Sequence, residues 1–291
     1  MIKVLPVNFL SNDINIAGNI YLPDLASDKK LPGIILCQGF AATKEMLLPA
    51  YAEKFAEAGY VALTFDYRGF GESGGELGKL VPSLQIEDIK NAVTYLSSLD
   101  NVDANRIGLW GTSYGGANAI VAASEDKRIK CLCVQLTFGD GERCVTANMP
   151  EEEVTRLKET LKKLEDKRDA TGKEMMVPVS KILTDEQSKA FLDANIERYP
   201  ELKIKIPFLT ILETLNYKPE TYIKNINIPI LIVGAEQDKV NPISETYSLY
   251  NIVSEPKELM VVKGATHFEL YSGNYFNEVI SKQLFWFKDS L

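Results

Sequence analysis

The sequence predicts an α/β fold in which a mostly parallel central sheet of about eight strands is flanked by helices. Apolar runs of strand length alternate with amphipathic runs of helical length along most of the 291 residues. Several of these apolar runs show no polar–apolar alternation, as expected for strands that are covered on both faces. Strands that alternate with helices in this way pair in parallel through right-handed crossovers.

The first half of the chain supplies most of the predicted strands. Its elements are two strands within residues 2–22 with a turn at 11–13, a polar loop at 26–30, strands at 33–37, 60–65, 106–110 and 129–136, and helices at 47–58 and 84–98. The last of these helices is amphipathic, because its apolar residues fall roughly on one face: Leu84, Ile86, Ile89, Val93 and Leu96.

The alternation resumes towards the C-terminus. Strands are predicted at 229–234 and 258–262, and helices at 241–253 and 273–289. The last helix is expected to bury four apolar residues, namely Phe276, Ile280, Leu284 and Phe287.

Between residues 139 and 224 the alternation stops and charged residues become frequent. Pro150 followed by three glutamates predicts the first turn of a helix, because acidic side chains are favourable at a helix N-terminus. Thr184 and Gln187 fit a capping box that opens a second helix. A structureless loop of this length is improbable inside a compact domain, so the segment is interpreted as helical.

The chain is therefore predicted to have two parts. Residues 1–138 and 225–291 form the core, and residues 139–224 form a helical cap inserted between two core strands. The cap is expected to roof the pocket with an apolar group made of Phe208, Leu209, Leu212 and neighbouring residues, which would favour an apolar acyl or aryl substrate.

Composition narrows the classes of function. The net charge of −8 and the pI near 5.0 argue against nucleic-acid binding as the main task. No apolar run approaches the ~20 residues of a membrane-spanning helix. The start of the chain has neither a long apolar segment nor a signal-cleavage pattern, so a cytoplasmic protein is expected. A homo-oligomer is left open by the sequence.

The four cysteines indicate neither a disulfide framework nor a metal site. Cys131 and Cys133 lie two residues apart on a predicted strand, a spacing that matches no zinc motif. No metal and no cofactor are therefore expected, and the thiols are interpreted as structural.

The stretch that points to catalysis is a strand, a glycine-rich turn and an alanine-rich helix around Ser113. The turn reads G-x-S-x-G, with glycines at 111 and 115. Glycine is needed beside such a serine because a Cβ would collide with the adjoining strand or helix. The serine hydroxyl is thereby exposed next to backbone N–H groups at a helix start, where negative charge is favoured. An acyl-transfer nucleophile requires this placement.

A serine hydroxyl needs a base, and His267 is the only histidine of the chain. It follows the last predicted strand, on the same edge of a parallel sheet as Ser113. An acid must then fix the histidine tautomer, and Asp238 after the preceding strand is the first choice. Asp140 and Glu236 are the alternatives, because both also follow strand ends.

The order serine, acid, histidine resembles that of the α/β-hydrolase superfamily. The resemblance covers residues 14–138 and 225–290, and it is strongest to esterases and dienelactone-hydrolase-like proteins. Through residues 66–73, which read DYRGFGES, the chain also looks like the catalytic domains of X-prolyl-peptidase-like hydrolases. The resemblance implies an oxyanion hole formed by the backbone N–H groups of Phe40 and Tyr114. Gln38 stands where many relatives have histidine, and it is expected to tie this loop by hydrogen bonding.

The sequence thus predicts a serine hydrolase that cleaves a carboxylic ester of a small or medium acyl or aryl substrate through an acyl-enzyme on Ser113. Thioester or peptide and amide hydrolysis would use the same triad. A catalytically inactive binding module is the alternative from another class, since a fold alone does not prove activity. The residues Gly69–Gly74 also match a dinucleotide-binding fingerprint, but the glycines and proline that follow predict a loop rather than a helix.

Overall fold

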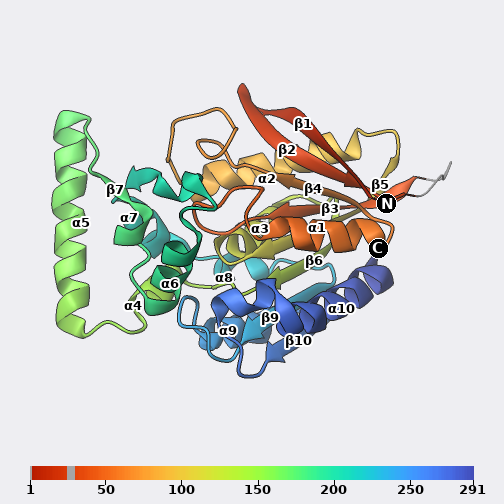
Figure 1. Cartoon of the computed structure of the whole chain (residues 1–291). Helices are drawn as coiled ribbons and strands as arrows, with labels where there is room; N and C mark the ends of the chain where they lie inside the picture. The colour runs from red at the N-terminus through yellow and green to blue at the C-terminus, as the bar shows by residue number, and fades with distance from the viewer. Residues whose placement is uncertain (1, 25–29) are drawn as a thin grey trace.

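The computed structural model describes residues 2–24 and 30–291. The loop predicted at 26–30 lies outside these residues, except for Lys30. Within these residues an eight-stranded sheet crosses the molecule in the order β1-β2-β4-β3-β5-β6-β9-β10 (Figure 1). Strand β2 pairs antiparallel with β1 and β4, and the other neighbours pair in parallel, which confirms the prediction. The strands are β1 (Lys3–Ser11), β2 (Ile14–Leu22), β3 (Leu31–Cys37), β4 (Val61–Phe65), β5 (Val102–Thr112), β6 (Ile129–Gln135), β9 (Ile230–Ala235) and β10 (Lys257–Val262).

Helices cover both faces of the sheet. Helices α1 (Leu48–Glu57) and α10 (Gly273–Ser290) lie on one face, and α2 (Pro82–Ser97), α3 (Tyr114–Glu125) and α9 (Ile243–Ile252) lie on the other (Figure 1). Each face has its own large apolar core. Every residue of β4 and β9 is buried, which explains why these strands read as unbroken apolar runs.

The cysteines are free thiols, and three of them are buried: Cys37, Cys131 and Cys133. Burial in the apolar interior raises the pKa of the Cys131 thiol to about 12. This thiol is therefore protonated at neutral pH and unsuited to act as a nucleophile. Each helix in residues 2–24 and 30–291 is too short or too polar to traverse a bilayer.

The segment between β6 and β9 is mostly helical, as the sequence predicts. It contains α4 (Gly141–Thr146), α5 (Glu151–Thr171), β7 (Met176–Pro178), η1 (Val179–Lys181), α6 (Glu186–Asn195), η2 (Pro200–Lys203), β8 (Lys205–Pro207), α7 (Thr210–Asn216) and α8 (Glu220–Ile223). The short strands β7 and β8 pair with each other and form a separate two-stranded sheet. Whether residues 139–224 act as a cap stays a prediction.

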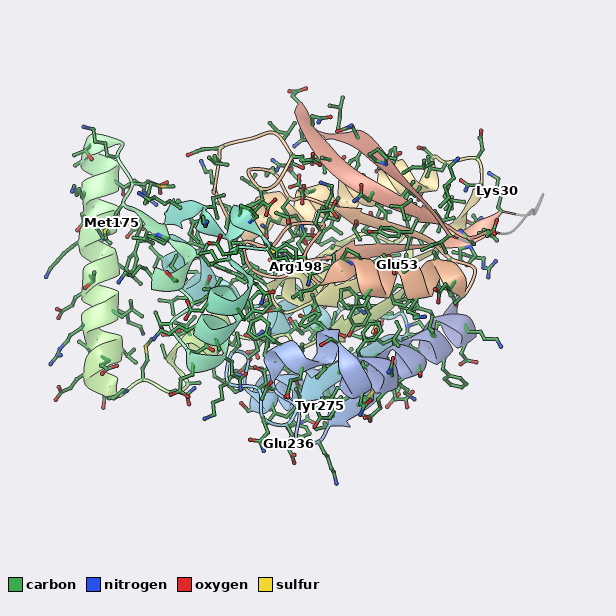
Figure 2. All side chains as sticks on the ribbon, viewed as in Figure 1. Lys30, Glu53, Met175, Arg198, Glu236 and Tyr275 are labelled. Atoms are coloured by element: carbon green, nitrogen blue, oxygen red, sulfur yellow. The ribbon has the colours of Figure 1, made fainter. Side chains whose placement is uncertain are left out.

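Helix α5 stands apart from the central sheet at the left of Figure 1, and its side chains project into solvent (Figure 2). It begins at Glu151 with three glutamates in its first turn, as predicted. Leu161 is its one fully buried residue. That leucine joins a small third apolar cluster with Leu209, Ile211 and Leu215 around α7. A narrow apolar stripe therefore attaches an otherwise charged helix.

The predicted capping box at the start of α6 is wrong by one residue. Asp185 is the N-cap, and its carboxylate accepts a hydrogen bond from the Ser188 N–H at 2.8 Å. Thr184 lies outside the helix. The Gln187 side chain does not fold back onto the cap, because it reaches residues of the core instead. Threonine and aspartate both favour the N-cap position, so the sequence alone did not decide between the neighbours Thr184 and Asp185.

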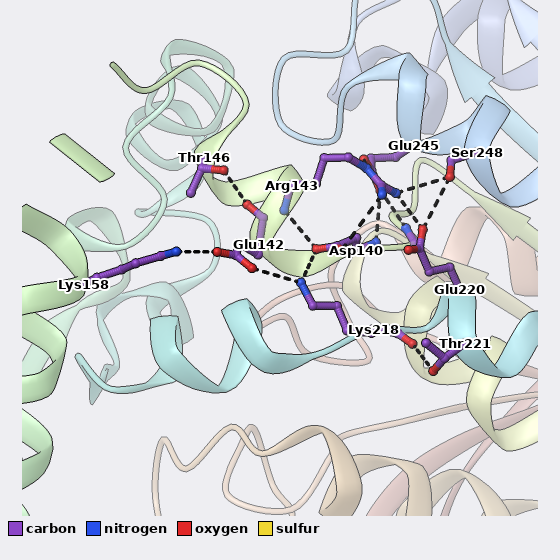
Figure 3. A network of polar contacts seen from close by, with 11 residues as sticks. Asp140, Glu142, Arg143, Thr146, Lys158, Lys218, Glu220, Thr221, Glu245 and Ser248 are labelled. Atoms are coloured by element: carbon purple, nitrogen blue, oxygen red, sulfur yellow. Dashed lines mark hydrogen bonds and ion pairs between the residues drawn. The ribbon is translucent and has the colours of Figure 1, made fainter. Parts of the chain in front are cut away.

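Ion pairs join the two ends of this segment to each other and to α9 (Figure 3). Asp140, just after β6, pairs with Lys218, just before α8. Arg143 pairs with Glu220 at 2.7 Å and also with Glu245 of α9. Glu245 is buried, and its carboxylate also accepts hydrogen bonds from the backbone N–H groups of residues 139 and 140. The two ends of the segment, at residues 139–143 and 218–220, are therefore fixed to each other and to the core.

Candidate active site

Ser113 occupies the sharp turn between β5 and α3. Its backbone has φ 53° and ψ −126°, a conformation that non-glycine residues rarely adopt. A Cβ on Gly111 would lie 2.7 Å from the carbonyl oxygen of Gly115, and a Cβ on Gly115 would lie 2.2 Å from that of Gln38. Glycine is thus required on both sides, and the strained turn projects the serine at the carboxyl edge of the sheet.

His267 and Asp238 meet at this same edge. Asp238 follows β9, and His267 begins the 3₁₀ helix η3 (His267–Tyr271) after β10. The imidazole Nδ1 and the carboxylate Oδ2 are 2.7 Å apart, and both side chains are buried. The other oxygen, Oδ1, accepts hydrogen bonds from the N–H groups of Val240 and Asn241, each at 2.8 Å. The carboxylate is therefore held in one orientation towards the ring.

The two alternative acids lie elsewhere. Asp140 caps α4 by accepting from the Arg143 N–H, and it pairs with Lys218. Burial alone would raise the pKa of Asp140, but the hydrogen bonds from Lys218 and Arg143 outweigh it and hold the pKa below its ordinary value. Glu236 accepts a hydrogen bond from the Gly264 N–H at 2.9 Å. Among the described residues, the carboxylate that contacts the histidine ring is that of Asp238.

Ser113 and His267 line the same cavity, but no hydrogen bond joins them in the described part of the chain. The side-chain partner of the Ser113 hydroxyl is Asn241, whose Nδ2 lies 3.3 Å from Oγ. Asn241 also donates to the carbonyl oxygen of Leu136 at 2.6 Å. This asparagine was not among the predicted site residues. Its only signal was its position in the loop that carries Asp238.

The two residues whose amides are predicted to form an oxyanion hole, Phe40 and Tyr114, border a cavity with Ser113. Their rings are in edge contact at 5.5 Å. The close approach of Gly115 to the carbonyls of Cys37 and Gln38 holds the loop after β3 against the start of α3. Neither of the two amides donates a hydrogen bond to another group within residues 2–24 and 30–291.

The expectation that Gln38 ties this loop is wrong. Its side chain is buried, and its amide oxygen and nitrogen have no hydrogen-bond partner among the described residues. Asp66 holds the loop instead, because it accepts from the Lys44 backbone N–H at 2.6 Å and from the Lys44 ammonium at 2.9 Å. The same carboxylate accepts from the Glu72 N–H at 3.0 Å. The turn at 69–75 thus helps to hold Asp66, which in turn holds the loop after β3.

This turn does not form the dinucleotide site that its glycines could suggest. Helix α2 begins only at Pro82, so no helix starts at the turn to hold a pyrophosphate.

Two cavities meet at Ser113. The smaller, of about 70 Å³, is bordered by His267 and by apolar side chains that include Met46, Phe191 and Phe268. The larger, of about 430 Å³, extends towards Asn241 and the segment between β6 and β9. Phe40, Leu183 and Val240 border both cavities, together with Ser113.

The three residues named for the predicted roof do not border these two cavities, although their neighbour Ile211 borders the larger one. Many of the described residues that border the two cavities belong to the inserted segment. They lie mainly on α6 and the residues before it, on α4 and the residues after it, and on one side of α5 and α7. Leu209, Phe208 and Leu212 belong instead to the cluster around Leu161. The apolar stretch breaks at Pro207, and α7 begins at Thr210, which turns these side chains towards α5.

Comparison with known proteins places this geometry in context. A family model described as X-Pro dipeptidyl-peptidase (S15 family) matches residues 12–269. An uncharacterized 31.7 kDa protein in the traX-finO intergenic region of Escherichia coli is 47% identical over 263 residues, which cover 90% of this chain and 92% of that protein. The thiohydrolase aneE of Aspergillus aculeatus is 29% identical over 303 residues, covering 98% and 93%. The crystal structure of the α/β hydrolase GrgF from Penicillium sp. sh18 has a TM-score of 0.81 at 24% identity, and the match covers 100% of this chain and 99% of that one.

Proposed function

The chain belongs to the X-Pro dipeptidyl-peptidase (S15) family and is a hydrolase with the α/β-hydrolase fold, and we propose that it cleaves a carboxylic ester through an acyl-enzyme on Ser113. The observation that carries the proposal is the strained turn at Ser113, which shares a cavity with a histidine held by a buried carboxylate. Nucleophile, base and acid then have the roles of a serine-hydrolase triad.

The proposed reaction has two halves. Ser113 Oγ attacks the acyl carbon while His267 takes the hydroxyl proton, and Asp238 stabilises the imidazolium through Nδ1–H. The backbone N–H groups of Phe40 and Tyr114 donate to the oxyanion. The tetrahedral intermediate collapses, the bond to the leaving oxygen breaks, and His267 returns the proton to that oxygen. A water then gives its proton to His267 and attacks the acyl carbon. The bond between this carbon and Ser113 Oγ breaks, His267 returns the proton to Oγ, and the acid is released.

The Ser113 hydroxyl must turn from Asn241 towards His267 for the first step. Hydrogen bonds of a catalytic site are often long or poorly aligned without substrate and tighten when substrate binds. The carbonyl oxygen of the bound ester would occupy the space near the two backbone amides. The amide of Asn241 is then left beside the nucleophile, on the side of the larger cavity.

The two cavities suggest how the substrate lies. Because His267 must protonate the leaving oxygen, the leaving group belongs in the smaller cavity, which His267 borders. Its apolar lining suits a small apolar alcohol. The acyl group then extends into the larger cavity of about 430 Å³, which offers room for a medium acyl or aryl chain. An ester-like small molecule is therefore the proposed ligand.

Thioester hydrolysis is a second candidate, supported by the name of the thiohydrolase relative. The same atoms would act on a thioester, with sulfur as the leaving atom. The small cavity beside His267 favours an oxygen ester of a small alcohol over a thioester with a bulky thiol. Peptide or amide cleavage, to which the family's name points, would likewise need the same triad.

A matched substrate panel tests the proposal. Esters, thioesters and amides that share one acyl group are compared by proton or thiol release, with wild type and Ser113→Ala. We expect the highest kcat/KM for esters of small alcohols and a loss of at least about 10⁴-fold in Ser113→Ala. Higher kcat/KM for the thioester would favour the second candidate. Equal rates for wild type and Ser113→Ala on every substrate would sink the acyl-enzyme proposal.

A further inference from the structure

One side chain of the inserted segment bonds to the loops of both the acid and the base. Gln187, in the first turn of α6, donates from Nε2 to the carbonyl oxygen of Gln237 at 2.8 Å. Its Oε1 accepts from the Lys239 N–H and from the His267 N–H, each at 3.3 Å. Gln237 and Lys239 are the immediate neighbours of Asp238 in the chain. A single amide thus bonds on both sides of the acid and to the backbone of the base.

Helix α6 is built to hold this amide in place. Asp185 fixes the start of the helix through the Ser188 N–H. One turn after Gln187, on the same face of the helix, Phe191 stacks on Phe268 with ring centroids 4.2 Å apart and planes 7° from parallel. Phe268 directly follows His267, so both contacts of α6 fall on the start of η3. The helix therefore docks against the loop that carries the histidine.

The two loops need such alignment because they leave different strands. The register of β9 and β10 pairs Ala235 with Val262 at the ends of the strands, and beyond this point the ladder stops. Two backbone hydrogen bonds continue the connection, from the Glu236 N–H to the Val262 carbonyl at 3.0 Å and from the Gln237 N–H to the Ala265 carbonyl at 2.8 Å. Gln187 adds bonds beyond them, next to the reacting side chains. A displacement of about 1 Å at a catalytic group can cost about 10²-fold in rate.

We propose that Gln187 is a positioning residue that keeps the loops of Asp238 and His267 in their relative positions. The proposal rests on the catalytic roles given above to these two residues. It assigns α6 a second task beyond bordering the cavity, because docking of this helix sets the geometry of the acid–base pair. The inserted segment then contributes to the rate and not only to the choice of substrate.

The test compares Gln187→Met with Lys189→Met. Methionine keeps the approximate volume of glutamine but removes all three hydrogen bonds, and Lys189 is an exposed residue of the same helix. On an ester of a small alcohol, we expect Gln187→Met to lower kcat by about tenfold or more, with KM changed by less than about twofold. Lys189→Met should match wild type in both constants.

A second readout does not depend on turnover. His267 is the only histidine, so ¹⁵N-histidine labelling gives ring signals that need no assignment. We expect Gln187→Met to shift or broaden the Nδ1–H signal, and Lys189→Met to leave it unchanged. Gln187→Glu, which keeps an acceptor for the Lys239 and His267 amides, should fall between Gln187→Met and wild type. It also serves as the test variant if the methionine variant does not fold.

The outcomes separate this inference from the proposed function. Wild-type kcat and wild-type ring signals in a folded Gln187→Met or Gln187→Glu protein would overturn the positioning role. A fall in Tm without change in either readout would make Gln187 merely structural and would overturn it as well. If wild type itself hydrolyses no ester, the proposed function fails, while the ring signals still test whether Gln187 holds the histidine loop.

Discussion

At the scale of single residues, side chains that are far apart in sequence hold the candidate site together. Asp238 divides its two oxygens between the backbone of its own loop and the ring of His267. Asn241 joins that loop to the Ser113 hydroxyl and to the Leu136 carbonyl. Leu136 itself has a positive φ of 54°, as Ser113 does with 53°. The strained backbone at the end of β6 is thus held by a side chain from the loop after β9.

Asn241→Ala should lower the free energy of unfolding by about 1–3 kcal/mol, because it leaves the buried Leu136 carbonyl without this donor. Urea denaturation measures the change. The matched control is Asn251→Ala at an exposed position of α9, for which a change within about 0.5 kcal/mol is expected. Equal stabilities of the two variants would show that the Asn241 amide does not support the turn at Leu136.

Gly115→Ala should reduce kcat by about 10²-fold or more, because its Cβ would lie 2.2 Å from the Gln38 carbonyl and would push the loop of Phe40 away from Tyr114. The matched control is Gly74→Ala, whose Cβ would meet no atom closer than 3.5 Å. Steady-state kinetics on one ester compares the two. A Gly115→Ala protein with wild-type kcat would contradict the role of the close approach between this loop and α3.

At the scale of elements, the inserted segment is fixed to the core at two places. At its two ends, Asp140 pairs with Lys218, and Arg143 pairs with Glu245 of α9. Helix α6 docks on η3 through Gln187 and the stacked rings of Phe191 and Phe268. Helix α5 packs through Leu161 and its apolar neighbours, and its Lys158 pairs with Glu142 of α4 in the same network (Figure 3).

Asp185→Ala should destabilise α6 by about 1 kcal/mol, because the Ser188 N–H loses its cap. Thr184→Ala, one residue earlier, should leave the stability within about 0.5 kcal/mol of wild type, because Thr184 lies outside the helix. Thermal unfolding of the two variants under the same conditions makes the comparison. A larger loss of Tm in Thr184→Ala would restore the capping box that the sequence suggested.

The Asp140 ion pair should weaken at acid pH. Its hydrogen bonds hold the folded-state pKa below the ordinary value of 3.8. The carboxylate therefore stabilises the fold above that value, and this contribution is lost as the pH falls through the folded-state pKa. Tm measured from pH 5 downward should fall more steeply for wild type than for Asp140→Asn, which cannot titrate there. Parallel curves would refute the linkage.

At the scale of the whole molecule, the sequence predicted the architecture because buried strands and amphipathic helices leave local patterns. The runs at 33–37 and 60–65 became β3 and β4, and the glycine-flanked serine marked the turn between β5 and α3. The pattern could not show what an apolar stripe packs against, so Phe208, Leu209 and Leu212 were expected over the pocket but pack in the cluster around Leu161 of α5. The contacts of Gln187 and Asn241 span 80 and 128 residues and leave no local signal.

The same limit explains which candidate residues could be predicted. Ser113 has a motif, His267 is unique in the chain, and Asp238 follows a strand end, so each could be named from the sequence. The residues that support them are ordinary polar residues in loops and in a helix. Their positions depend on how the inserted segment folds against the core, and composition and periodicity do not determine this.

The most direct test of the central claim is the intact mass of the protein after treatment with a small alkyl fluorophosphonate, which reacts with activated serines. Wild type, Ser113→Ala and His267→Ala are compared under the same conditions. We expect one adduct on wild type, none on Ser113→Ala, and labelling of His267→Ala that is slower by about 10³-fold or more. An unlabelled wild type, or a Ser113→Ala protein that is labelled as fast as wild type, would contradict the account.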